Sequence, residues 1–262
     1  MKPEDMASRL ASFLPSELRR TQRALKGAGR RNPDEPVHEA RKSIKKLRAA
    51  LRLARKMAPK RARDGVGHPL REAAHALGPL RDHLVLNKTG RDLAKRGENM
   101  PPLPDAPDPG PLLKRARAEL GRATRELQRL RQGGFNELGA EAGLRRIYRR
   151  ARKEMKKTCK SESDADLHAW RRRAKDLYYV LDLVEAPSGY VEKMKRLTEL
   201  LGDDHDLACF EQAHGSAAAR KTHHYILKRA KKRRRPLQKN AFRLGRRLFD
   251  RDERDFVRRV LA

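Results

Sequence analysis

Two stretches of the chain carry a histidine, an arginine and a lysine at the same spacing. The first begins at His38 and reads HEARKSIKKLRAALRL, and the second begins at His168 and reads HAWRRRAKDLYYVLDL. On an α-helix, positions i, i+3 and i+7 lie on one face, so each stretch presents the three side chains side by side. Arginine offers a bidentate fork to phosphate oxygens, and lysine offers a movable positive charge. We therefore interpret each stretch as part of a surface that binds phosphate groups.

The two stretches are copies of one repeat, offset by 130 residues from His38 to His168. Charge is kept in the pairs Arg41 and Arg171, Lys42 and Arg172, and Lys45 and Lys175. One departure is that Tyr178 stands opposite Arg48, which makes the second copy less basic at that turn.

Three further segments recur in the same order, which argues against a chance repeat. Segment 17–26 matches 147–156, LGPLRD at 77–82 matches LGDDHD at 201–206, and LLKRAR at 112–117 matches ILKRAK at 226–231. The basic residues of these segments extend the candidate binding surface, and they are Arg19, Arg20, Arg23, Lys114, Arg115, Arg149, Arg150, Lys153, Lys228 and Arg229.

An apolar stripe accompanies the basic stripe in both copies. Its 3-4-3-4 spacing is that of a helix packed in a bundle. At about 100° per residue the two stripes are centred roughly 90–100° apart, so the basic side chains can line a groove or channel between helices. The apolar positions are Val37, Ala40, Ile44, Leu47 and Leu51 in the first copy, and Leu167, Trp170, Ala174, Leu177 and Leu181 in the second.

These patterns predict an all-α protein, because no alternating strand pattern competes. We expect one domain over 1–262, built from two antiparallel four-helix bundles related by a pseudo-twofold. The halves divide near Gly133 and Gly134, into 1–133 and 134–262. Pro79 should bend the third helix, and the terminal segment should form one or two helices that brace the other half. Residues 101–111 read as a proline-rich linker before a helix that begins near Leu112.

Composition points to a polyanionic partner. The chain has 65 Lys and Arg against 34 Asp and Glu, a net charge of +31, which repels itself in a compact state. Aromatic residues make up only 5%, which disfavours binding by base stacking. Two cysteines indicate reduced thiols rather than a disulfide framework. We expect a cytoplasmic protein without membrane contact, since no segment approaches the roughly 20 apolar residues of a membrane span.

The paired His-x-x-Arg-[Lys/Arg]-x-x-Lys helices, each followed by Leu-Gly-x-x-x-Asp, resemble the CHAD domain, the conserved histidine α-helical domain. The resemblance covers nearly the whole chain. It implies two four-helix bundles around a central basic channel that binds inorganic polyphosphate, and an association with polyphosphate granules and their proteins. Some members are fused to a triphosphate-processing domain, but no acidic β-tunnel sequence is present here, so we expect a stand-alone member. The site core would be His38, Arg41, Lys42, Lys45, His168, Arg171, Arg172 and Lys175.

His38 and His168 are open to three interpretations: core residues, phosphate contacts or metal ligands. The cations around them disfavour a metal. As phosphate contacts, they predict an affinity that rises as pH falls through about 6.5. Asp82 and Asp206 are interpreted as anchors for nearby cations. Arg233 to Arg235 are read as surface charge or a polyanion tether.

Two other functions stay open beside polyphosphate binding. Non-specific binding to a nucleic-acid backbone is the main alternative. A metal-dependent phosphohydrolase is a third, suggested by His205 within DDHD and by His223 and His224. We predict no catalytic residue, no metal ligand and no cofactor. The sequence leaves chain-length preference, oligomeric state and biological role open.

Overall fold

The computed structural model describes residues 3–28, 33–95, 98, 100–216 and 223–261, and no strand occurs among them. This confirms the all-α prediction. The elements are α1 (Pro3–Lys26), α2 (Asp34–Leu53), the 3₁₀ turn η1 (Ala54–Lys56), α3 (Lys60–Ala76), α4 (Gly78–Leu93), α5 (Pro109–Gln132), the 3₁₀ turn η2 (Glu137–Gly139), α6 (Ala140–Ser161), α7 (Asp164–Leu183), α8 (Ser188–Ala213), α10 (His224–Leu248) and α11 (Glu253–Leu261). None of the described helices is long and apolar enough to span a membrane.

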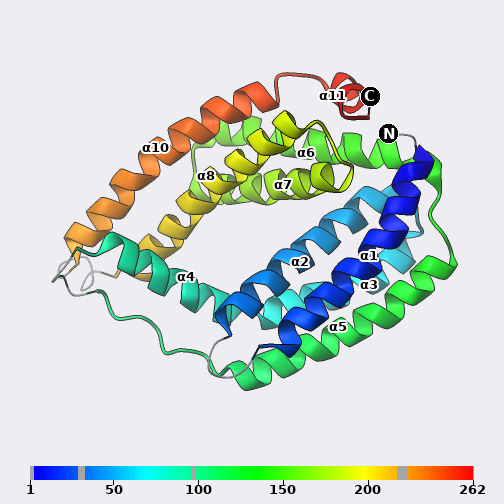
Figure 1. Cartoon of the computed structure of the whole chain (residues 1–262). Helices are drawn as coiled ribbons and strands as arrows, with labels where there is room; N and C mark the ends of the chain where they lie inside the picture. The colour runs from blue at the N-terminus through cyan, green and yellow to red at the C-terminus, as the bar shows by residue number, and fades with distance from the viewer. Residues whose placement is uncertain (1–2, 29–32, 96–97, 99, 217–222, 262) are drawn as a thin grey trace.

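The same helix pairs pack in both halves of the chain. In the first half α1 packs on α2 and α3 on α5, and in the second α6 packs on α7 and α8 on α10. The repeated helices α2 and α7 lie side by side in the middle of the molecule and join the halves (Figure 1). One cluster of buried apolar residues continues through both halves. The repeat therefore positions its two basic helices at the centre.

The apolar stripes of α2 and α7 are buried, as predicted. Val37, Ala40 and Ile44 are fully covered, and so are Trp170 and Ala174. Burying such side chains stabilises the fold by about 25 cal/mol for each Å² removed from water. With the apolar stripes turned into the core, the basic stripes beside them are fixed at its border.

Pro79 breaks the third helix of the first half, which confirms the predicted bend. α3 ends at Ala76 and α4 begins at Gly78, with Pro79 in the first turn of α4, where its missing N–H costs no hydrogen bond. The matching helix of the second half, α8, is continuous over 26 residues. The break lets α4 leave the first bundle and contact α8 and α10.

The fourth helix begins earlier than predicted. α5 starts at Pro109, inside the segment expected to be a linker, after Asp108 accepts a hydrogen bond from the N–H of Gly110 at 2.9 Å. Prolines suit the first turn of a helix because their fixed φ is already helical. The proline-rich composition therefore hid a helix start.

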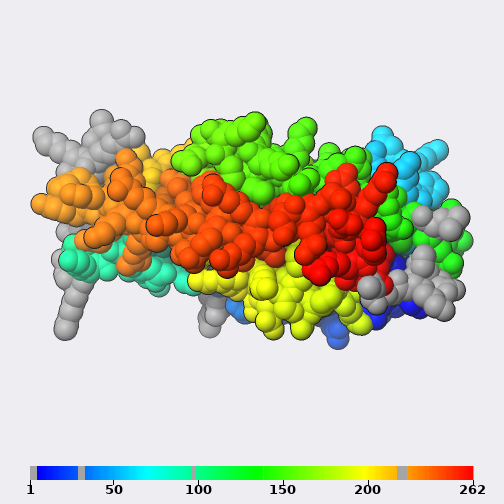
Figure 2. Space-filling model, turned by 90° about the horizontal axis from the view of Figure 1, so that it is seen from above, coloured from blue at the N-terminus to red at the C-terminus, as the bar shows by residue number. Residues whose placement is uncertain are grey.

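The terminal helix α11 packs on α6 of its own half rather than bracing the other half. Its Phe256 ring stacks on Tyr148 with centroids 3.9 Å apart. Figure 2 shows α10 and α11 along one face, between α6 and the start of α8. The predicted helix is therefore confirmed, but the prediction that it packs against the other half is wrong.

A close helix crossing depends on Gly143. A Cβ added there would overlap the carbonyl oxygen of Leu53 at the end of α2. We predict that Gly143→Ala lowers the free energy of unfolding by about 1–3 kcal/mol in urea titrations, because backbone has to move. Gly121→Ala in α5 is the control, since nothing lies within 4 Å of its added Cβ. The control should be stabilised by about 0.5–1 kcal/mol, and equal losses in both variants would contradict the close crossing.

Candidate functional site

Five cations from three helices form what we call the central cluster: Arg41 and Lys45 of α2, Arg81 of α4, and Arg171 and Lys175 of α7. Each of the two lysines feels repulsion from Arg171, and Lys45 also from Arg41 and Arg81. Arg41 is in turn repelled by Arg81 and Arg171. Matched basic side chains of the repeat thus meet at the interface between the two halves.

The lysines of the central cluster lose their protons near neutral pH. Burial, followed by repulsion from Arg171, lowers the pKa of Lys45 to about 7. Burial and Arg171 lower the pKa of Lys175 to about 8, although Asp206 opposes part of the effect. A bound anion would favour the charged lysines and raise both pKa values again. A bound anion would therefore stabilise the positive charges of the central cluster.

Carboxylates lie near the cluster but do not neutralise it by contact. Asp82 attracts Arg41, and its repeat counterpart Asp206 attracts Arg171. No ion pair within 4 Å involves either aspartate among the described residues. Burial raises the pKa of Asp206, and Arg171 offsets part of that rise. Arg41 is instead held by a backbone carbonyl, donating from Nη1 to the oxygen of Ala74 at 2.7 Å.

The Nε–H groups of Arg41 and Arg171 are buried and find no acceptor in the part of the chain that the structure describes, as is also the case for Arg145 and Arg229. A buried donor without an acceptor costs about 1–3 kcal/mol. Because Arg41 and Arg171 are repeat counterparts, the same incomplete bonding occurs in both halves. Donors kept in this state are suited to an oxygen-rich ligand.

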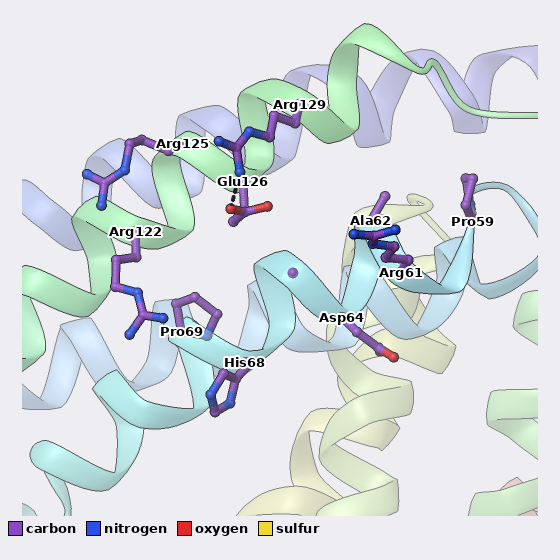
Figure 3. Close-up of a pocket in the computed structure, with 11 residues that line it drawn as sticks. Pro59, Arg61, Ala62, Asp64, His68, Pro69, Arg122, Arg125, Glu126 and Arg129 are labelled. Atoms are coloured by element: carbon purple, nitrogen blue, oxygen red, sulfur yellow. Dashed lines mark hydrogen bonds and ion pairs between the residues drawn. The ribbon is translucent and has the colours of Figure 1, made fainter.

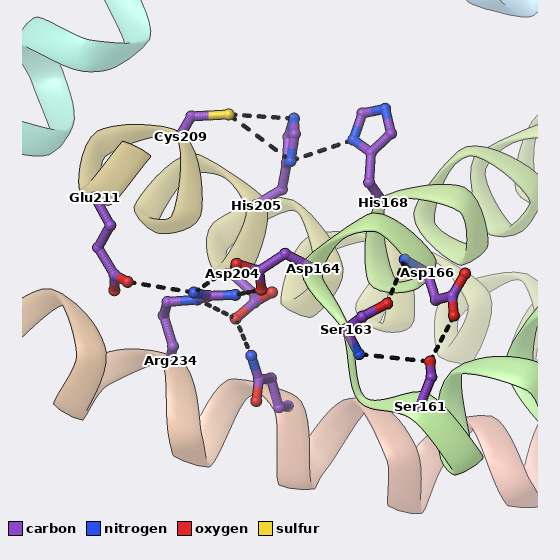
Figure 4. A network of polar contacts seen from close by, with 11 residues as sticks. Ser161, Ser163, Asp164, Asp166, His168, Asp204, His205, Cys209, Glu211 and Arg234 are labelled. Carbon is purple, nitrogen blue, oxygen red and sulfur yellow. Dashed lines mark hydrogen bonds and ion pairs between the residues drawn. The ribbon is translucent and has the colours of Figure 1, made fainter. Parts of the chain in front are cut away.

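The two repeated histidines are neutral at neutral pH. Burial, followed by Arg81, lowers the pKa of His38, and burial followed by Arg172 lowers that of His168. His168 contacts His205 of α8, with their Nδ1 atoms 3.3 Å apart (Figure 4). Burial and Arg171 lower the pKa of His205 to about 3, and its Nε2 lies 3.6 Å from Sγ of Cys209. The histidines therefore become charged at a lower pH than the value of about 6.5 predicted from the sequence.

A pocket of about 1190 Å³ opens beside this histidine pair, between α7, α8 and α10. His168 and Arg172 line it from α7, and Lys228 and Lys231 line it from α10. The structure thus brings Lys228 to the histidines, as the repeat suggested. No group of three side chains suited to a metal ion was found among the residues described.

Arg229, the neighbour of Lys228, is engaged elsewhere. It forms a two-pronged ion pair with Glu98, in the segment between α4 and α5. Most of the candidates outside α2 and α7 lie exposed on α1, α5 and α6. Several candidates, including Lys42 of α2, are paired with glutamates: Arg20 and Lys42 with Glu39 at 3.3 and 3.2 Å, Arg115 with Glu72 at 3.1 Å, and Arg149 with Glu253 at 3.6 Å. Arg19, Arg23, Lys114 and Lys153 form no ion pair within 4 Å with the residues that the structure describes.

Arg48 and Arg150 are brought to the α2–α7 interface, together with a residue that the repeat did not indicate. Arg52 donates to Asp176 of α7 at 3.0 Å and shares a pocket with Arg150. It was missed because its counterpart in the repeat is Asp182. Arg81 was missed for a similar reason, since it aligns with His205. The short LGPLRD match nevertheless carried the signal that this position faces the site.

Arg234 is a structural residue rather than the surface charge or tether expected of it. Its side chain is only 8% exposed and forms ion pairs with Asp164, Asp204 and Glu211 (Figure 4). The Asp204 contact measures 2.9 Å, and Asp204 is 3% exposed. These hydrogen bonds raise the pKa of Arg234 despite its burial. The network ties α10 to α7 and α8.

We predict that Arg234→Met lowers the free energy of unfolding by about 3–5 kcal/mol, because it leaves buried Asp204 without its cation. Urea unfolding at pH 7 measures the effect. Arg235→Met is the matched control, since Arg235 is exposed and its side chain forms no hydrogen bond or ion pair with described residues. Similar stabilities for the two variants would contradict the role assigned to the network.

Comparison with known proteins gives two findings. A family model described as "CHAD domain" matches residues 12–215. Among solved structures, the crystal structure of the CHAD domain from the plant Ricinus communis is similar with a TM-score of 0.57, at 21% sequence identity, over 92% of this chain and 91% of that chain. At that identity the likeness establishes the fold alone. No curated protein matches the chain.

Proposed function

The chain belongs to the CHAD domain family, and on that premise we propose that its central cluster binds inorganic polyphosphate. The observation that carries the proposal is the meeting of matched cations from α2 and α7 without carboxylates in contact. Their burial depresses the pKa of Lys45 and Lys175, and repulsion among them adds to the effect. A chain of phosphate groups supplies the missing negative charges in a row.

Polyphosphate fits these features better than nucleic acid does. It carries about one negative charge per unit and no bases, so it requires many cations and no base-reading groups. Aromatic residues, on which bases stack, make up only 5% of the chain. Non-specific binding of a nucleic-acid backbone would use the same charges and is kept as the competing outcome of the experiments below.

In the proposed complex the polymer lies in a basic channel between α2 and α7. Arg41 and Arg171 would donate their free Nε–H groups, and Lys45 and Lys175 would follow the chain as point charges. The pocket beside His168 would receive one end, with Arg172 and Lys228 as further contacts. The proposed role is binding without catalysis, in the cytoplasm and at polyphosphate granules, with granule-associated proteins as further partners.

We predict that Arg41→Gln/Arg171→Gln weakens binding of long-chain polyphosphate by about a hundredfold. Each lost charge-assisted contact is worth about 1.5 kcal/mol or more, and 1.4 kcal/mol is tenfold in affinity. Fluorescence titration at fixed salt measures it, with RNA and duplex DNA as competitors. Arg235→Gln/Arg259→Gln removes the same charge at exposed positions and should change affinity less than threefold. Equal losses in the two variants, or equal competition by nucleic acid, would refute the proposal.

The lysine pKa values predict a pH dependence. Below pH 7 both lysines are charged in the free protein, and between pH 7 and pH 9 they lose their protons. Binding of a phosphate chain at the higher pH then requires both lysines to take up a proton again. We therefore predict that affinity falls at least tenfold from pH 7 to pH 9, since one pKa unit corresponds to about 1.36 kcal/mol. Lys45→Arg/Lys175→Arg, which stays charged, should flatten the profile. The same slope in this variant would contradict the assignment.

A further inference from the structure

Three pockets along α2 and α3 share lining residues. The pocket between α2, α6 and α7 has a volume of about 80 Å³ and shares Arg52 and Arg63 with a pocket of about 150 Å³ between α2 and α3. The latter shares Asp64 and His68 with a third pocket of about 740 Å³ between α3 and α5. Each pocket therefore shares two lining side chains with the next.

We name this lining the arginine track. It holds twelve arginines against three carboxylates, Asp64, Glu126 and Asp176, an excess of nine positive charges. The arginines are Arg48, Arg52, Arg55, Arg61, Arg63, Arg71, Arg122, Arg125, Arg129, Arg146, Arg150 and Arg173. Eight of them form no ion pair within 4 Å with any described residue, namely Arg48, Arg55, Arg61, Arg63, Arg71, Arg125, Arg146 and Arg150.

The arginines of the track repel one another. Burial lowers the pKa of Arg52, and Arg173 and Arg150 lower it further against the attraction of Asp176. Burial and Arg150 likewise lower the pKa of Arg146. Like charges held together in this way favour binding of an anion, which relieves the repulsion.

The outer end of the track lies between α3 and α5 (Figure 3). Arg122 and Arg129 extend from α5 toward α3, where Arg61 and His68 stand on the opposite wall. Glu126 holds Arg129 at 2.6 Å, and its carboxylate fits against Gly65, where an added Cβ would lie 2.9 Å from Oε2. Cations thus border both sides of this outer pocket.

The track joins the central cluster through α2. Arg48 follows Lys45 by three residues, so it lies one helical turn further along the same face. Arg48 also feels repulsion from Arg52, Arg71 and Arg172, which links the track to α7. Along α3 the lining runs from Pro59 to Arg71, and helical residues rise about 1.5 Å each, so this part alone extends over about 18 Å.

We propose that the arginine track binds the continuation of a polyphosphate chain that occupies the central cluster, so that long chains bind more tightly than short ones. The inference rests on the proposed function and adds a determinant of chain length to it. A short chain fills the central cluster alone. A long chain also contacts the track, and each additional contact slows its release without the cost of a second binding event.

The experiment compares tripolyphosphate with long-chain polyphosphate on the full chain. Arg61→Gln/Arg71→Gln/Arg125→Gln removes three exposed track arginines that have no ion pair with described residues. Arg235→Gln/Arg254→Gln/Arg259→Gln removes the same charge from exposed positions outside the track, as the matched control. The track variant should lose at least tenfold in affinity for the long chain and less than twofold for tripolyphosphate. The control should lose less than threefold for both.

Other outcomes overturn the inference. If the track variant and the control lose equal affinity for the long chain, the track contributes only general charge. If the track variant loses affinity for duplex DNA but not for long-chain polyphosphate, the track binds nucleic acid. If tripolyphosphate and the long chain both fail to bind the unaltered protein, the proposed function itself fails, which is distinguishable from failure of the track alone.

Discussion

The structure depends on holding like charges together at the border of its core. Arg41, Lys45, Arg171 and Lys175 converge from two helices, and burial removes part of the water that would screen them. Taking an ion out of water costs several kcal/mol unless a counter-charge compensates for it. Here the matched carboxylates Asp82 and Asp206 attract the arginines, and neither forms an ion pair within 4 Å with a described residue. The free protein thus retains this unfavourable repulsion, and binding of an anion would relieve it.

Packing in the rest of the fold offsets the unfavourable free energy of these crowded cations. Fully buried apolar stripes on α2 and α7, including Trp170, fix the helices whose other faces carry the cations. The buried carboxylate Asp204 neutralises Arg234 in the second half, where the ion pairs connect α10 to α7 and α8. Asp204 therefore stabilises the scaffold, whereas the central cluster retains its excess of cations. This division is expected where binding needs unpaired charges on a rigid frame.

Sequence reasoning predicted the two central helices well, because the repeat and the helical period gave independent signals for the same residues. It missed Arg52 and Arg81, whose counterparts are Asp182 and His205, because a search for matched positions passes over asymmetric ones. It misread Arg234, because a basic run does not reveal which member faces buried carboxylates. Contacts set by tertiary packing, such as α11 on α6, have no local signal. The arginine track also arises from helices distant in sequence.

The most direct test of this account is urea unfolding of Lys45→Met/Lys175→Met beside the unaltered protein, at pH 6.5, with and without long-chain polyphosphate. Without polyphosphate the variant should be at least as stable as the unaltered protein, because two crowded cations are removed. At a hundred times its Kd, polyphosphate should add about 2.7 kcal/mol to the unaltered protein, and clearly less to the variant at the same concentration. A variant that is less stable alone and equally stabilised by polyphosphate would contradict the central claim.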